Sequence, residues 1–159
     1  MLMSSLNPLL NVTVVSDQHV DTRLALLKFE SSGELESLDG LMVDNSISSF
    51  DGSSLIQADE DEQYFSVNLE KQRLVIRQIE LCVQVSLAQN GKVVLVMNSD
   101  FNVEVEIPAT FVRDDTALLI LKLKRFGVDW KMVGSKLLLQ QTINSFVTKI
   151  KYQKGKLKI

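Results

Sequence analysis

Apolar and polar residues alternate with a period of two through much of this chain, and this period constrains the fold more than any other feature. In residues 79–87 every odd position is apolar, while Cys82 lies on the other, more polar face. Successive side chains of a strand point to opposite faces, so this pattern predicts a half-buried antiparallel strand. The predicted fold class is therefore mostly β.

Other segments with strand character follow one another along the chain. They are residues 11–16, 23–30, 65–69, 93–97, 101–107, 117–124 and 130–133. Ser31-Ser32-Gly33 predicts a hairpin turn, and Asn90-Gly91 predicts a tight turn that makes residues 93–97 the partner of residues 79–87. Pro108 ends the strand before it. Repeated short strands joined by turns indicate an antiparallel β-sandwich.

The C-terminal segment changes to a helical period. Its apolar residues recur every three or four positions and are Leu139, Ile143, Phe146, Val147 and Ile150. The spacing predicts one amphipathic helix over residues 136–152, followed by a basic tail over residues 153–159. A chain of 159 residues is long enough to bury roughly 70% of its unfolded surface as one domain. The expected organisation is a single domain over residues 1–159.

Charge is distributed unevenly between the two halves of the chain. Residues 1–70 contain 13 acidic and 2 basic side chains, whereas residues 71–159 contain 7 acidic and 15 basic ones. Neutralisation of the two halves within one fold is the simpler interpretation. The other is an acidic face presented to cations and a basic face presented to an acidic partner.

The densest acidic segment predicts a cation site. Four adjacent carboxylates, Asp59 to Glu62, repel one another unless solvent, salt or a cation offsets their charge. Calcium takes six to eight oxygen ligands, and an extended chain presents these carboxylates on two faces, so one ion would require a bend and further ligands. The candidate ligands are Asp21, Asn45, Asp59, Glu60, Asp61 and Glu62. A solvated acidic loop is the alternative.

Other functional classes find little support in the residues. The single cysteine, Cys82, excludes an intramolecular disulfide, and the single histidine, His19, leaves no Cys/His cluster of the zinc type. No glycine-rich phosphate loop or nucleophile with a plausible base is present, so no catalytic residue is assigned and we expect a protein that is not an enzyme. Without a signal-peptide pattern or a run long enough to cross a bilayer, the expected location is the cytoplasm.

The order of several short motifs resembles the TerD-type proteins of tellurium resistance and stress response. The matching segments are Leu24-Ala25-Leu26-Leu27, Asn45, Asp51-Gly52-Ser53, the acidic run Asp59 to Glu62, Val67-Asn68-Leu69, Asp115-Thr116-Ala117-Leu118, and Arg125 to Trp130-Lys131. The resemblance covers residues 9–147. One departure is His19-Val20-Asp21, where the family has Asp-Leu-Asp, so that an imidazole replaces one carboxylate and calcium would lose a hard oxygen ligand.

The resemblance implies a divergent calcium-binding β-sandwich. Its function would be that of a calcium-responsive interaction module in tellurite resistance or the general stress response, with proteins of a stress-response complex as partners. The alternative is a metal-independent scaffold or adaptor that binds a basic protein through the acidic N-terminal half. The lysine-rich C-terminus lacks interleaved aromatic residues beyond Tyr152, so we expect no nucleic-acid binding. Membrane association through the C-terminal helix is a third, less favoured interpretation.

Overall fold

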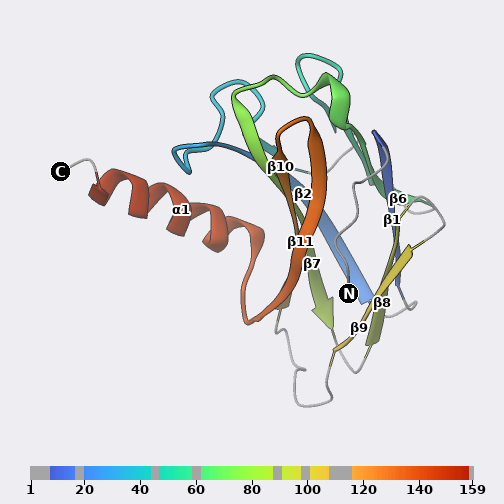
Figure 1. The fold of residues 1–159 in the computed structure, drawn as a ribbon. Helices are drawn as coiled ribbons and strands as arrows, with labels where there is room; N and C mark the ends of the chain where they lie inside the picture. Colours follow the sequence, from blue (N-terminus) through green and yellow to red (C-terminus); the bar gives the residue numbers. More distant parts are fainter. Residues whose placement is uncertain are drawn as a thin grey trace.

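The chain folds into two antiparallel sheets packed face to face, with one helix on the outside (Figure 1). The computed structural model describes residues 8–16, 20–43, 47–58, 62–87, 91–97, 101–107 and 116–157. In Figure 1 the layers follow one another from helix to five-stranded sheet to six-stranded sheet. The predicted β-sandwich with a C-terminal helix is confirmed.

The two sheets have different strand orders. The six-stranded sheet has the order β4-β5-β6-β1-β8-β9, with β4 Ile47–Ser48, β5 Ser54–Ala58, β6 Gln63–Asn68, β1 Leu9–Ser16, β8 Gly91–Met97 and β9 Phe101–Ile107. The five-stranded sheet has the order β11-β10-β7-β2-β3, with β11 Asp129–Leu139, β10 Thr116–Phe126, β7 Ile76–Leu87, β2 Val20–Glu30 and β3 Leu41–Val43. A short 3-10 helix, η1 Leu69–Lys71, joins β6 to β7.

The core between the sheets is built by the alternating positions. Leu24 and Leu26 of β2 contribute to it, and so do Leu81 and Val83 of β7. Phe65 of β6 meets them from the other sheet and is fully buried. The period-two pattern in the sequence therefore identified the inner faces of these strands, because one face of each must be removed from water.

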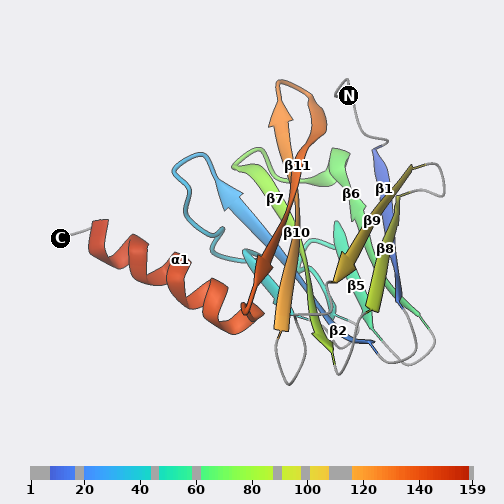
Figure 2. The ribbon, with the colours of Figure 1, turned by 90° about the horizontal axis from the view of Figure 1, so that it is seen from below.

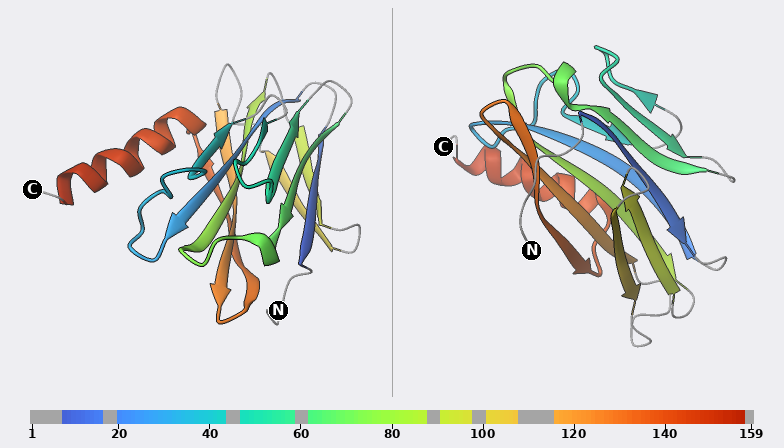
Figure 3. Two further views of the ribbon diagram at one scale, coloured as in Figure 1. Left: turned by 90° about the horizontal axis from the view of Figure 1, so that it is seen from above. Right: turned by 45° about the vertical axis from the view of Figure 1, so that its right-hand side comes forward.

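A second apolar cluster covers the outer face of the five-stranded sheet. Cys82 of β7 and Leu118 of β10 lie there, under Ile143 and Val147 of helix α1 Ile143–Leu157. Figure 3 shows this helix on the side of the sheet that faces away from the other sheet. Cys82 is thus fully buried rather than half-buried, because the helix covers a face that the sequence pattern marks as polar.

The predicted hairpin between residues 79–87 and 93–97 is wrong. Strand β7 pairs with β2 and β10 in the five-stranded sheet, whereas β8 pairs with β1 and β9 in the six-stranded sheet. The chain therefore crosses from one sheet to the other between Leu87 and Gly91. A central place suits β7 because it is buried on both faces.

The predicted helix over residues 136–152 is also corrected. Residues 136–139 belong to β11, where Leu137 to Leu139 pair with Ala117 to Leu119. Gln140 then takes a left-handed backbone conformation, with φ of 56°, which ends the strand. Thr142 Oγ1 accepts a hydrogen bond from the Ser145 backbone N–H at 3.1 Å, so the N-terminal cap of the helix lies at Thr142. The helix continues to Leu157, into the segment predicted as a basic tail.

The connections between strands divide the molecule into two ends. At the first, which we call the acidic end, the chain passes from β1 to β2, β3 to β4, β5 to β6, β7 to β8 and β9 to β10. At the second, which we call the Lys28 end, it passes from β2 to β3, β4 to β5, β6 to β7, β8 to β9 and β10 to β11. Figure 2 shows the β10–β11 hairpin extending beyond its neighbours at the Lys28 end.

Helix docking can be tested through Cys82. We expect the native thiol to react slowly with a thiol reagent, because burial raises its pKa well above the usual range and the nearby Glu80 carboxylate adds to this rise. Truncating Ile143 and Val147 to alanine removes about 2 kcal/mol or more of packing. The labelling rate should then increase by about tenfold or more.

Asn144→Ala is the matched control, because Asn144 is exposed on the same helix. Its labelling rate should equal that of the wild type. Equal rates in all three proteins would contradict docking of the helix over Cys82.

Candidate functional site

Most of the predicted metal ligands lie outside the described residues. This is so for Asn45, Asp59, Glu60 and Asp61. Asp21 has its backbone in β2, opposite Ser86 of β7, but its side chain is not described. Glu62 immediately precedes β6 and is exposed. The ligand set therefore stays a prediction.

The described residues that flank these positions nevertheless converge at the acidic end. Thr22, which follows Asp21, donates a hydrogen bond from Oγ1 to Oε1 of Gln63, which follows Glu62. This bond joins the start of β2 in one sheet to the start of β6 in the other. The backbone positions next to Asp21 and Glu62 are therefore neighbours in space, although they lie far apart in the sequence.

The chain segment on either side of Asn45 also passes from sheet to sheet at this end. Val43 pairs with Ala25 in the five-stranded sheet, and Ile47 pairs with Ile56 in the six-stranded sheet. Ala58 pairs with Gln63 where β5 gives way to β6. Among the described residues alone, no group of three or more His, Cys, Asp or Glu side chains is arranged to hold a metal ion. A cation site here would thus depend on Asp21, Asn45 and the Asp59–Asp61 segment.

A buried lysine organises the opposite end of the sandwich. Lys28 follows Leu24 and Leu26 on the inward face of β2, and its side chain is fully buried. Its Nζ donates a hydrogen bond to Oγ of Ser53 at 3.2 Å. Burial lowers the pKa of Lys28, against the opposing charges of Asp51, Asp39 and Glu36. The arrangement places a cation inside the core, surrounded by acidic and hydroxyl groups.

Asp51 connects this buried cation to the surface. Its Oδ1 accepts hydrogen bonds from Ser53 Oγ at 2.6 Å, from Ser49 Oγ at 2.8 Å and from the Ser53 backbone N–H at 2.9 Å. Gly52 between them has φ of 73°, which glycine adopts without steric cost. Although desolvation raises the pKa of Asp51, these hydrogen bonds and the charge of Lys28 lower it to about 2.

Two further carboxylates, Glu36 and Asp39, hold the loop between β2 and β3. Glu36 Oε2 accepts from the backbone N–H groups of Leu38 and Asp39 at 3.1 and 2.6 Å and forms an ion pair with Arg73 at 2.6 Å. Asp39 Oδ1 accepts from the Phe50 N–H at 2.8 Å, which ties this loop to the β4–β5 turn. Glu36 and Asp39 are both buried. Their function here is to satisfy backbone donors and to neutralise Arg73.

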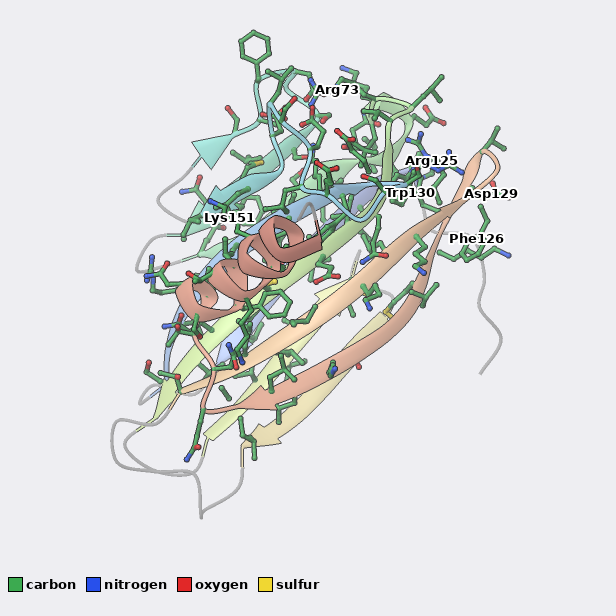
Figure 4. All side chains as sticks on the ribbon, turned by 90° about the vertical axis from the view of Figure 1, so that its left-hand side faces the viewer. Arg73, Arg125, Phe126, Asp129, Trp130 and Lys151 are labelled. Atoms are coloured by element: carbon green, nitrogen blue, oxygen red, sulfur yellow. The ribbon has the colours of Figure 1, made fainter. Side chains whose placement is uncertain are left out.

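Arg125 connects the same end to the β10–β11 hairpin. Its guanidinium donates to the carbonyl oxygens of Arg73 and Gln72 at 3.4 and 3.2 Å and lies 4.8 Å from the centre of the Trp130 ring. Figure 4 shows Arg125 beside Trp130, with Phe126 and Asp129 farther out on the hairpin. The hairpin and the η1–β7 connection therefore form one bonded unit.

A separate hollow lies on the outer face of the five-stranded sheet. It has a volume of about 350 Å³ between β11 and Phe146 of the helix, and Glu80, Lys122 and Lys136 are among the residues that line it. Glu80 is buried, and desolvation raises its pKa although the charge of Lys122 opposes this. The hollow combines one carboxyl with two ammonium groups, and Gln78 Nε2 donates to the carboxyl at 2.7 Å.

Comparison with known proteins identifies the architecture. No protein-family model matches the sequence, and no curated protein matches it significantly. Solved structures do. SAV2460, described as a protein of unknown function, has a TM-score of 0.63 at 9% identity, covering 88% of this chain and 95% of that one. SCO6318 of Streptomyces coelicolor A3(2), described as a homologue of telluride resistance protein (TerD), has a TM-score of 0.53 at 10% identity, covering 84% and 89%.

The chain has a TerD-like fold. This confirms, for the fold, the resemblance carried by the short motifs, such as Asp51-Gly52-Ser53. At this level of identity the likeness concerns the architecture alone. In addition, no helix among the described residues is long and apolar enough to span a bilayer.

Sequence reasoning missed most of the buried charge network in this TerD-like fold. Asp51-Gly52-Ser53 stands out in the sequence as a short motif, but Lys28, Glu36 and Asp39 do not. One signal was available: Lys28 continues the inward-facing series of Leu24 and Leu26. A lysine in such a series indicates a buried ammonium group that needs partners.

The Asp51 cluster predicts a specific acid sensitivity. The pKa of Asp51 is about 2 in the folded protein, against an ordinary value of 3.8. Because the folded pKa is lowered, the stabilising contribution of the carboxylate is present above pH about 4 and is lost as the pH falls toward 2. Asp51→Asn should therefore make the free energy of unfolding depend less steeply on pH between about 4 and 2.

Urea unfolding at several pH values measures this slope. Ser53→Ala removes a donor to the same carboxylate, so it should reduce the slope in the same direction. Parallel curves for wild type and Asp51→Asn would contradict the assignment.

Gly40 provides a test of the loop between β2 and β3. A Cβ at this position would lie 2.1 Å from the Glu36 carbonyl oxygen and 2.6 Å from its nitrogen. Gly40→Ala should therefore lower the free energy of unfolding by about 1–3 kcal/mol. Gly134→Ala is the control, since nothing lies within 4 Å of a Cβ there. Equal stabilities of the two variants in urea unfolding would disprove the close approach.

Proposed function

We propose that this protein is a non-enzymatic, calcium-responsive interaction module of a tellurite-resistance or stress-response system. One observation carries the proposal: the segments flanking the predicted oxygen ligands, which are dispersed in the sequence, meet at the acidic end of the sandwich. The Thr22–Gln63 hydrogen bond is the clearest instance. The TerD homologue among the structural neighbours supports the assignment to tellurite resistance.

The proposed ligands are Asp21, Asn45, Asp59, Glu60, Asp61 and Glu62. Calcium would supply positive charge among these oxygens and offset the mutual repulsion of the carboxylates. The acidic connections would then become ordered against the end of the sandwich. Ordering of this kind presents a docking surface to another protein, which is how a local charge change becomes an interaction switch.

The β-sheet scaffold suits such a switch. The strands that lead into these connections belong to both sheets and share one core. Loops placed on a rigid scaffold can change order without disturbing the core. Partner proteins of a stress-response complex are the proposed ligands of the ordered surface.

Thermal unfolding in chelator and across a calcium series tests the proposal, with magnesium as the control ion. A ligand that binds only the folded state stabilises it by about 2.7 kcal/mol at a concentration of 100 Kd. We expect a calcium-dependent rise in the unfolding midpoint of the wild type. The Asp59→Asn/Asp61→Asn double variant should lose this rise.

Asp51→Asn is the matched control, because it removes a carboxylate at the Lys28 end and should keep the calcium response. If the wild-type midpoint does not change with calcium, the metal switch is refuted. The charge asymmetry then favours the alternative, a metal-independent adaptor that binds a basic partner. This alternative predicts partner binding that is sensitive to salt, is weakened by the same double variant and does not depend on calcium.

A further inference from the structure

Four apolar side chains stand exposed on two neighbouring connections of the Lys28 end. We call them the tip patch: Leu74, Val75, Phe126 and Val128. Their exposed fractions are 83%, 46%, 47% and 95%, respectively. Leu74 and Val75 follow η1, and Phe126 and Val128 belong to the β10–β11 hairpin. Exposed apolar side chains that lie together mark an interaction surface more often than scattered ones do.

The two connections that carry the tip patch are bonded to each other. Arg125 of the hairpin bonds the carbonyl oxygens of Gln72 and Arg73, immediately before Leu74. Leu74 and Val128 line the same hollow of about 410 Å³, and Trp130 also lines it. The two connections therefore present their apolar side chains from one bonded unit rather than from independent loops.

Cationic side chains surround the tip patch in excess. On the same two connections and their adjoining strand ends lie Lys71, Arg77, Lys124, Arg125 and Lys131, against the acidic residues Glu70 and Asp129. Burial lowers the pKa of Arg125, and the nearby charge of Arg77 lowers it further. Two like charges held close together would be stabilised by an anionic surface.

The opposite end of the molecule is more acidic than the two connections that carry the tip patch. The connections at the acidic end contain one arginine, Arg113, and eight carboxylates: Asp17, Asp44, Asp59, Glu60, Asp61, Glu62, Asp114 and Asp115. A negatively charged planar surface would repel this end and attract the tip patch. The other connections of the Lys28 end contain the carboxylates Glu34, Glu36, Asp39, Asp51 and Asp100, so cationic attraction would be confined to the η1–β7 connection and the β10–β11 hairpin.

We propose that the tip patch docks onto an anionic lipid surface. The hairpin extends beyond its neighbours (Figure 2), which suits insertion of Val128 and Phe126 into the headgroup region. Lys71, Lys124 and Lys131 would remain at the level of the lipid phosphates. Apolar insertion combined with cationic attraction is the usual basis of peripheral membrane binding.

This surface is distinct from the C-terminal helix and from the calcium proposal. In Figure 4, Lys151 of the helix lies well away from the hairpin residues Phe126 and Asp129. The proposed calcium ligands belong to the opposite end. Failure of either proposal therefore leaves the other intact.

Co-sedimentation with vesicles of phosphatidylcholine containing phosphatidylserine tests the inference on the full chain. We expect the wild type to partition onto these vesicles, and onto pure phosphatidylcholine at least tenfold more weakly. Leu74→Asp/Val128→Asp should reduce partitioning onto the anionic vesicles by about tenfold or more. Lys71→Gln/Lys131→Gln should weaken binding to anionic vesicles and reduce its dependence on salt.

The matched control is Val15→Asp/Leu139→Asp, which adds the same charge at two half-exposed apolar positions outside the tip patch. Circular dichroism confirms that each variant is folded. Binding retained by this control and lost by the Leu74/Val128 variant supports the inference.

Three results would overturn it. The first is that the wild type does not partition onto anionic vesicles. The second is binding that survives Leu74→Asp/Val128→Asp but disappears when residues 149–159 are removed, which would assign it to the helix. The third is an absence of vesicle binding together with a dimer that this double variant dissociates, which would assign the patch to a second copy of the chain.

Discussion

Burial of both faces of the five-stranded sheet is the constraint on which the rest of the structure depends. The inner face packs on the other sheet, and α1 covers Cys82 and Leu118 on the outer face. A strand buried on two sides must occupy a central position, so β7 pairs with β2 and β10. The connection after Leu87 then has to cross to the other sheet, and this crossing sets the order of the loops at the acidic end.

The two ends of the sandwich differ in how their charged side chains are arranged. At the Lys28 end, a buried ammonium group lies near Asp51, Asp39 and Glu36, and each of these carboxylates accepts hydrogen bonds within the protein. The charges of this buried cluster are thus paired within the protein, which favours a rigid framework beneath the tip patch. At the acidic end, the proposed calcium ion would offset the mutual repulsion of the carboxylates in the connections.

The two ends of the molecule would therefore bind different ligands. The proposed calcium ligands and the proposed lipid-binding side chains are separated by the length of the strands, with one shared core between them. An ion bound by the proposed ligands would act at the acidic end. The ion would reduce the negative charge of that end. It would thereby weaken the repulsion that turns the acidic end away from an anionic surface.

The period of two along the sequence determined the fold class, most strands and their inward faces, because a half-buried strand must alternate. The short motifs pointed to a TerD-like architecture, which the structural neighbours confirm. Local sequence patterns gave wrong predictions where contacts between distant residues determine the structure. Asn90-Gly91 suggested a hairpin, but pairing across the sheets overrode it, and Leu139 matched a helical spacing although its pairing with Ala117 keeps it in β11. Only the tertiary structure placed Cys82 beneath a helix, brought Lys28 to Ser53 and Thr22 to Gln63, and gathered the tip patch. Each of these arrangements joins residues that lie far apart in the sequence, so no local pattern predicts it.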